Sequence, residues 1–102
     1  MGDENNINDE KNDFLTLDYI KNYLRVDYND DDEFLLNCLE MALLHAKNII
    51  GKRFDDVKNN ADVKQAIMYH IAQIYQNKAG ENTLPQASSE IYKLYRDIKI
   101  GI

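Results

Sequence analysis

Residues 30–50 carry the clearest pattern of apolar and polar positions in the chain. Apolar side chains recur there every three or four residues, which is the spacing of a helix with one buried stripe. The stripe is formed by Leu35, Leu39, Ala42, Ala46 and Ile49, and it is widened by Leu36, Leu43 and Ile50. Acidic residues 30–33 precede it, where a helix N-terminus favours negative charge, and Gly51 follows at a position that suits a left-handed C-cap. We therefore predict a central helix of ~30 Å around which the other segments pack.

Three shorter patterns indicate further helices on either side of this one. Thr16 is suited to cap a short helix over residues 16–24. Residues 62–77 form the second longer helix, with a stripe of Val63, Ala66, Ile67, His70, Ile71 and Ile74. Ser88 or Ser89 is expected to cap a last helix over 88–96 that buries Ile91, Leu94 and Tyr95. The predicted fold is all-α, a small bundle of two longer antiparallel helices plus two short helices, with an extended C-terminal tail.

The two ends of the chain do not share the helical period. Residues 1–13 are polar and acidic, and we predict a leader that is disordered in the free protein. Residues 98–102 alternate, so Ile98, Ile100 and Ile102 would share one side of an extended segment. Such a tail either docks on another chain as an arm or folds back over its own helices, and both readings stay open. The predicted organisation is a leader over 1–13, a helical domain over 14–97 and a tail over 98–102.

Composition and charge narrow the class of protein. A chain of 102 residues is one domain, its single cysteine excludes an internal disulfide and fits a reducing compartment, and no apolar run reaches the ~18 residues of a membrane span. Residues 1–33 carry eleven acids and three bases, a net charge of −8, whereas residues 34–102 carry nine bases and seven acids, a net charge of +2. A general nucleic-acid binder would show a basic face, and none is evident.

Candidate chemistry is sparse. An EF-hand alignment of Asp27, Asn29 and Asp31 fails, because Asp32 and Cys38 stand where the loop requires glycine and glutamate. His45 lies two turns from Cys38 on the same helix, ~10 Å along the axis, which is too far for a nucleophile and its base. His70 sits on an apolar stripe and is interpreted as a satisfied core histidine. We therefore assign no catalytic, cofactor-binding or metal-binding residue.

One basic patch follows the central helix, in a segment over 52–60 that we predict to be a loop pinned by Phe54 and Val57. Lys52 and Arg53, with Lys47 and Lys58 nearby, either contact an acidic partner surface or only complement the dipole at the helix C-terminus. Both interpretations are kept.

Several segments together resemble the small head–tail connector proteins of long-tailed bacteriophages, also called DNA-packaging or head-completion adaptors. The resemblance rests on residues 15–17, 20–27 and 30–32, on Ala42, Ala46 and Ile49, on the turn 51–54, and on residues 63–67 and 75–78, with a weaker match at 84–85 and 94–96. The acidic leader is longer than the family pattern, and the C-terminal segment lacks the proline that often precedes Tyr-Arg there.

The resemblance implies a structural protein without catalysis or cofactor that forms a ring beneath the portal of the capsid, from a phage or a prophage. Its partners would be itself as a ring homo-oligomer, the portal protein and the next tail or stopper component, with DNA passing through unbound and no membrane involved. It would reside in the virion neck, and in the bacterial cytoplasm during assembly. The subunit or partner contacts are hypothesised to include Lys52, Arg53, Lys58, Ile98, Ile100 and Ile102. The alternative is a small helical protein-interaction or regulatory module without catalysis, and a nucleic-acid-binding regulator ranks below it.

Overall fold

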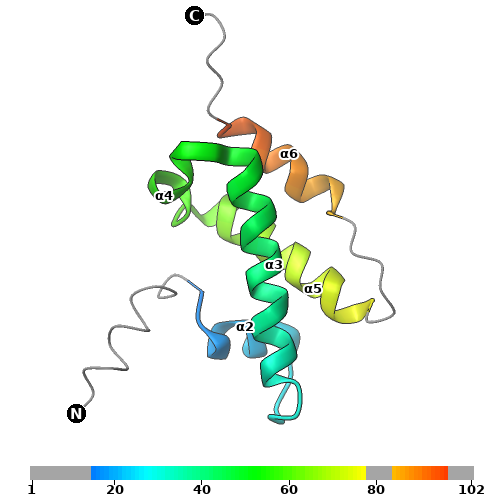
Figure 1. Ribbon diagram of the computed structural model, residues 1–102. Coiled ribbons are helices and arrows are strands. Elements are labelled where there is room, and N and C mark those ends of the chain that lie inside the picture. The colour runs from blue at the N-terminus through cyan, green and yellow to red at the C-terminus, as the bar shows by residue number, and fades with distance from the viewer. Residues whose placement is uncertain (1–14, 78–83, 97–102) are drawn as a thin grey trace, which may run out of the picture.

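The computed structural model describes residues 15–77 and 84–96, and every element in these ranges is a helix (Figure 1). In chain order the elements are α2 (Leu17–Leu24), α3 (Asp32–Ile50), the 3-10 helix η1 (Gly51–Arg53), α4 (Phe54–Val57), α5 (Ala61–Gln76) and α6 (Gln86–Leu94). The all-α prediction is therefore confirmed. The predicted leader over 1–13 and tail over 98–102 lie outside the described residues.

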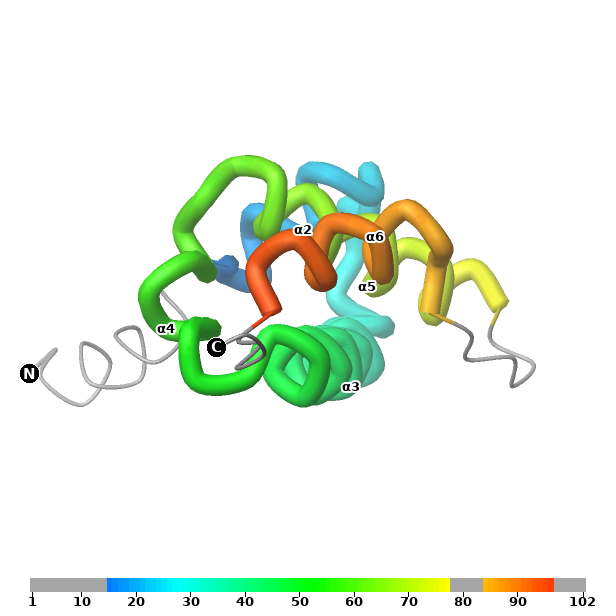
Figure 2. The backbone as a smooth tube through the Cα atoms, turned by 90° about the horizontal axis from the view of Figure 1, so that it is seen from above, coloured from blue at the N-terminus to red at the C-terminus, as the bar shows by residue number. Residues whose placement is uncertain are grey.

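The helices form two layers, with α3 in one layer and α2, α5 and α6 in the other (Figure 2). α5 runs back across α3 in the opposite sense, and it also carries α6 on its flank (Figure 1). α2 packs on the N-terminal half of α3, where Thr16 Oγ1 accepts a hydrogen bond from the Tyr19 N–H at 3.1 Å. Thr16 is thus the N-cap that the sequence predicted.

The core lies between the two layers and is built from the two predicted stripes. The buried residues of α3 are Leu35, Cys38, Leu39, Ala42, Ala46 and Ile50, and those of α5 are Val63, Ala66, Ile67, Met68, His70, Ile71 and Ile74. Leu43 and Ile49 are partly buried against this core, whereas the side chain of Leu36 stays 42% exposed on the outer side of α3. The prediction that Leu36 widens the buried stripe is wrong, since only one side of α3 meets the second layer (Figure 2).

The segment after α3 is helical where the sequence predicted a loop. Gly51 adopts φ 83° and ψ −144°, a positive φ that favours glycine but lies outside the left-handed helical region. The chain therefore turns a corner and continues as η1 and α4 instead of ending at a left-handed cap. Phe54 and Val57 are buried, as predicted, and this burial holds the corner on the core.

The start and the buried face of α6 also differ from the prediction. α6 begins at Gln86 after Pro85, so neither Ser88 nor Ser89 caps it. Ser88 is instead buried, and its hydroxyl donates to the Ala66 carbonyl oxygen of α5 at 2.7 Å. Tyr92, one turn later, is buried on the same side, whereas Leu94 is 75% exposed. A small residue at 88 lets α6 approach α5 closely, and the helical period then turns Leu94 toward solvent.

Candidate subunit interface

The N-terminal end of α3 is acidic and is held in place by a lysine of α2. Lys21 Nζ donates to Asn29 Oδ1 at 2.8 Å and to Asp32 Oδ1 at 2.7 Å, which ties the loop between the two helices to α2. Asp27, Asp30 and Glu33 remain exposed around this anchor. This end therefore presents carboxylates at the helix terminus that favours negative charge.

A second polar contact joins the acidic loop to the far end of α5. The Tyr75 hydroxyl donates to Asp31 Oδ2 at 2.7 Å, and the Tyr28 hydroxyl lies 3.2 Å from the Tyr75 hydroxyl. The hydrogen bonds to Tyr28 and to Asp31 raise the pKa of Tyr75, which keeps its phenol protonated and donating. No periodicity in the sequence signals this contact, because 44 residues separate Asp31 from Tyr75.

The opposite end of α3 is basic. Lys52 and Arg53 are exposed on η1, and Lys47 lies over the Phe54 ring with its Nζ 5.7 Å from the ring centroid. α6 ends beside this corner, so the exposed Lys93 of α6 and the exposed Arg96 that follows the helix come to the same end of the molecule (Figures 1 and 2). We call the exposed set Lys47, Lys52, Arg53, Lys93 and Arg96 the basic end.

The structure brings some of the predicted contact residues together and separates others. Lys52 and Arg53 are neighbours within the basic end. Lys58 is half-buried, with its Nζ 3.6 Å from Asp55 Oδ1, so an ion pair already engages its charge. Ile98, Ile100 and Ile102 lie outside the described residues. The sequence analysis did not include Lys93 and Arg96 among the candidate contact residues. Two cations at the end of the predicted last helix could have indicated them.

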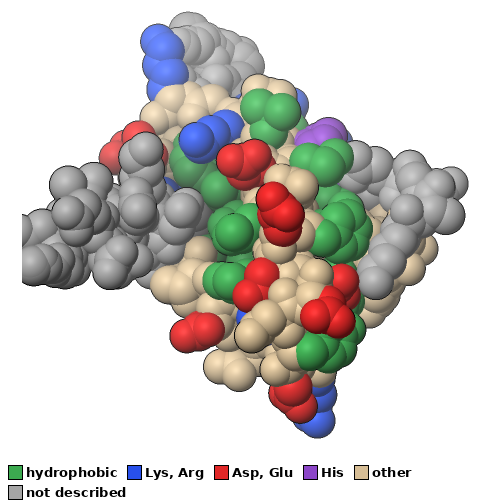
Figure 3. Space-filling model, turned by 60° about the horizontal axis from the view of Figure 1, so that its bottom comes forward, with side chains coloured by type: hydrophobic (Ala, Val, Ile, Leu, Met, Phe, Trp, Pro, Cys, Tyr) green, Lys and Arg blue, Asp and Glu red, His purple; other side chains and the backbone are tan. Residues whose placement is uncertain are grey.

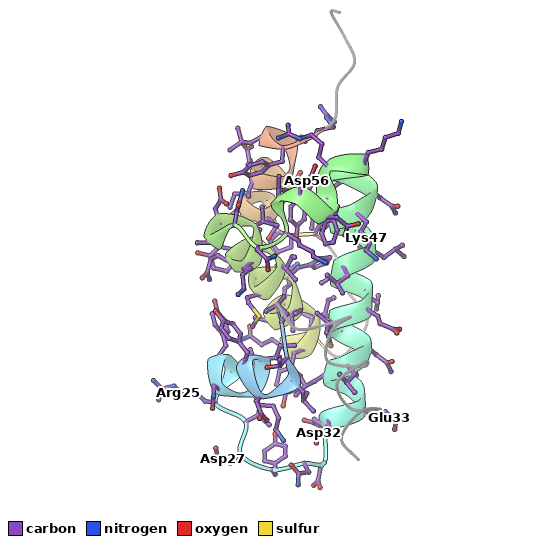
Figure 4. All side chains as sticks on the ribbon, turned by 90° about the vertical axis from the view of Figure 1, so that its left-hand side faces the viewer. Arg25, Asp27, Asp32, Glu33, Lys47 and Asp56 are labelled. Atoms are coloured by element: carbon purple, nitrogen blue, oxygen red, sulfur yellow. The ribbon has the colours of Figure 1, made fainter. Side chains whose placement is uncertain are left out.

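Opposite charges therefore stand at opposite ends of one long helix. Figure 4 shows Asp27, Asp32 and Glu33 near one end of α3 and Lys47 toward the other, where the exposed Asp56 of α4 also lies. Asp32 and Glu33 in the first turn of α3 and Lys47 in its last turn complement the helix dipole, which accounts for their sign at either terminus. The same arrangement gives the molecule two unlike charged surfaces, of the kind that meet when copies or partners assemble in one orientation.

The buried side chains of the core include one unusual polar pair. His70 of α5 is fully buried and meets His45 of α3 edge-on, with ring centroids 5.0 Å apart. Neither ring nitrogen of His70 has a hydrogen-bond partner among the described residues, so the predicted core histidine is buried but not satisfied. Burial, and then the nearby charge of His45, lower the pKa of His70 to about 4.

This pair forms no nucleophilic or metal-binding site with its surroundings. Cys38 is buried, and the described residues contain no group of three or more histidine, cysteine or carboxylate side chains arranged to hold a metal ion. Among the helices that the structure describes, none combines the length and apolar character that a membrane span requires.

The comparisons with known proteins agree with a structural role. A family model matches residues 14–98 of the chain. The model describes a structural class, the proteins that join a phage head to its tail. The chain belongs to this family, which is described as the phage gp6-like head-tail connector proteins, and the resemblance seen in the sequence is confirmed. No curated protein and no solved structure matches the chain. Membership places the chain among components of the virion neck that contact other head and tail proteins.

Proposed function

We propose that this chain is the subunit of a ring that sits beneath the portal, extends the DNA channel and joins the head to the next tail or stopper component. The observation that carries the proposal is the family match over residues 14–98. The structure adds support, because the acidic and basic ends are two unlike charged surfaces, which suits contacts of one orientation with a ring neighbour or with the portal. The same reasoning proposes that 14–97 is the connector domain, with the leader and the tail as appendages.

The proposed role involves no catalysis and no cofactor. DNA would pass through the ring without specific binding, which suits a chain with net charge −6. Assembly would take place in the bacterial cytoplasm, and the finished ring would stay in the virion neck.

We propose that the basic end contacts an acidic surface of a ring neighbour or of the portal. Replacing both Lys52 and Arg53 with glutamate is expected to weaken self-association or portal docking by at least tenfold, because two attractive charges become repulsive. The double glutamine variant is expected to give an intermediate effect. Light scattering and portal co-sedimentation measure the two associations at matched ionic strength.

The fold of these variants provides the control, since both residues are exposed on η1. Their melting temperatures are expected to stay within a few degrees of wild type. If the double glutamate variant associated with itself and with the portal as wild type does, the proposal would be wrong. Lys52 and Arg53 would then only complement the helix dipole.

The tail over 98–102 is proposed to dock on another chain through Ile98, Ile100 and Ile102. Deleting these five residues is expected to lower assembly while the monomer keeps its melting temperature, because the buried isoleucine surface would belong to the interface. Thermal unfolding at a concentration where the protein is monomeric distinguishes the alternative. A clear drop in that melting temperature would show that the tail covers its own helices.

The second candidate function is an interaction or regulatory module that acts without forming a ring. It is favoured by the tyrosines exposed on the surface, since tyrosine is enriched where proteins meet partners. The mass of the protein in solution, alone and with a portal protein, separates the two functions.

A further inference from the structure

The outer side of α3 carries apolar side chains that no described element covers. Leu36 and Leu44 on this side are 42% and 59% exposed. Glu33 and Glu40 lie on the same side, and both are exposed. Figure 3 shows apolar and acidic side chains next to one another on this side of the molecule. We call this surface the α3 outer face.

A different exposed surface follows the seam between α2 and α5. Lys64 Nζ of α5 lies 5.5 Å from the centroid of the Tyr19 ring, and Gln65 Nε2 donates to the Tyr23 hydroxyl at 3.0 Å. Tyr69 follows Gln65 by one helical turn and is also exposed, so the three tyrosines share this surface. We call it the tyrosine face.

The two faces point in different directions. His70 meets His45 of α3, so its position marks the side of α5 that faces the other layer. Gln65 lies five residues earlier, ~140° around the helix from His70. The tyrosine face therefore looks away from α3, while the α3 outer face looks out of the other layer (Figure 2).

We propose that the α3 outer face of one copy docks on the tyrosine face of a second copy, a lateral contact that rests on the proposed ring. Leu36 and Leu44 would pack on the tyrosine rings, which bury large apolar area with little entropy cost. The carboxylates of Glu33 and Glu40 would meet Lys64 and the tyrosine hydroxyl donors, which supplies complementary charge.

Charge also decides against the α3 outer face pairing with itself. A two-fold axis at the centre of Leu36 and Leu44 would place Glu40 of one copy against Glu40 of the other, because Glu40 lies midway between the two leucines. Like charges in contact are unfavourable. The heterologous arrangement avoids this clash and, unlike a two-fold contact, continues from copy to copy until a ring closes.

The test uses two variants that each disable one face. Leu36→Glu with Leu44→Glu removes the α3 outer face, and Tyr69→Glu removes the tyrosine face. Asn59→Glu, at an exposed position between α4 and α5, is the matched control for added charge. Sedimentation velocity is measured up to ~100 μM protein, because a contact with a micromolar Kd is mostly occupied at that concentration. Wild type and control are expected to sediment as species larger than a dimer. Each face variant alone is expected to sediment as a monomer with its melting temperature retained.

Mixing the two face variants gives the sharpest result. Each retains the face that the other lacks, so the equimolar mixture is expected to form a one-to-one dimer and nothing larger. A mixture that stays monomeric overturns the proposal, as does wild type that is monomeric at every concentration. A dimer formed by Tyr69→Glu alone would instead show α3 pairing with itself.

A charge exchange provides an independent measurement on an intact apolar surface. Glu40→Lys is expected to weaken wild-type association, and adding Lys64→Glu in the same chain is expected to restore most of it. No restoration counts against the proposed pairing of these two residues. Portal binding is measured separately on the same variants: a chain that binds the portal while remaining monomeric would overturn this lateral contact and leave the connector role standing.

Discussion

Replacing Ile67 with alanine is expected to lower the free energy of unfolding by ~2–5 kcal/mol, the range for deleting buried methyl and methylene groups. Ile67 is fully buried on α5, in the core between the two layers. Leu39→Ala, on the facing stripe of α3, is expected to cost a similar amount. Chemical denaturation monitored by circular dichroism measures both changes, with the denaturant slope checked for constancy.

Leu94→Ala provides the matched control, because it removes the same kind of apolar side chain from a position that is 75% exposed. Its expected cost is below ~0.5 kcal/mol, as for surface substitutions. A loss below ~1 kcal/mol for Ile67→Ala would mean that α5 does not pack on α3 through this residue, and the described core would be wrong.

Acidification is expected to destabilise the protein through His70. The pKa of this side chain falls from the ordinary 6.5 to about 4 in the folded state, so the unfolded chain takes up the proton first. The stabilising contribution of neutral His70 is therefore complete above pH 6.5 and is lost progressively as the pH falls toward 4. At ~1.4 kcal/mol per pKa unit, the full loss is on the order of 3 kcal/mol.

His70→Phe separates this effect from the titration of carboxylates, because it keeps a ring against His45 and removes the buried titrating group. The free energy of unfolding, measured from pH 7 to 4.5, is expected to fall more steeply in wild type than in the variant. Parallel pH profiles for the two proteins would contradict a neutral, buried His70 that is charged only on unfolding.

The elements that the sequence predicts well are those whose signal is local. The period of apolar residues in α3 and α5 defines two faces that must be buried, and Thr16 satisfies a backbone N–H within one turn. The same local reasoning failed at residues 51–57. A glycine with positive φ is suited both to the end of a helix and to a corner after which the chain continues as helix, and Gly51 is the second case. The predicted N-cap at Ser88 was wrong for a related reason. Serine is frequent at N-caps, but it is also small enough to allow a close contact between two helices.

The features of the candidate interface depend on contacts between distant residues, and periodicity carries no information about them. Lys93 and Arg96 join Lys52 and Arg53 only because α6 ends beside the α3–α4 corner (Figure 1). The exposure of Leu36 and Leu44 follows from α3 forming one layer alone, which a helical pattern does not specify. The stacking of His45 on His70 likewise requires the crossing of α3 and α5. The sequence predicted the family correctly and proposed Lys52 and Arg53 as contact residues, and the tertiary structure shows which residues surround these two.

The central claim is that this chain joins a phage head to its tail as a ring on the portal. The most direct test is the mass of the complex formed when the purified chain is added to the portal protein of the same phage or prophage, followed by cryo-electron microscopy of that complex. The account predicts several copies bound as one closed ring at one end of the portal, continuous with its channel. A chain that stays unbound, or binds as isolated single copies with no ring, would contradict it.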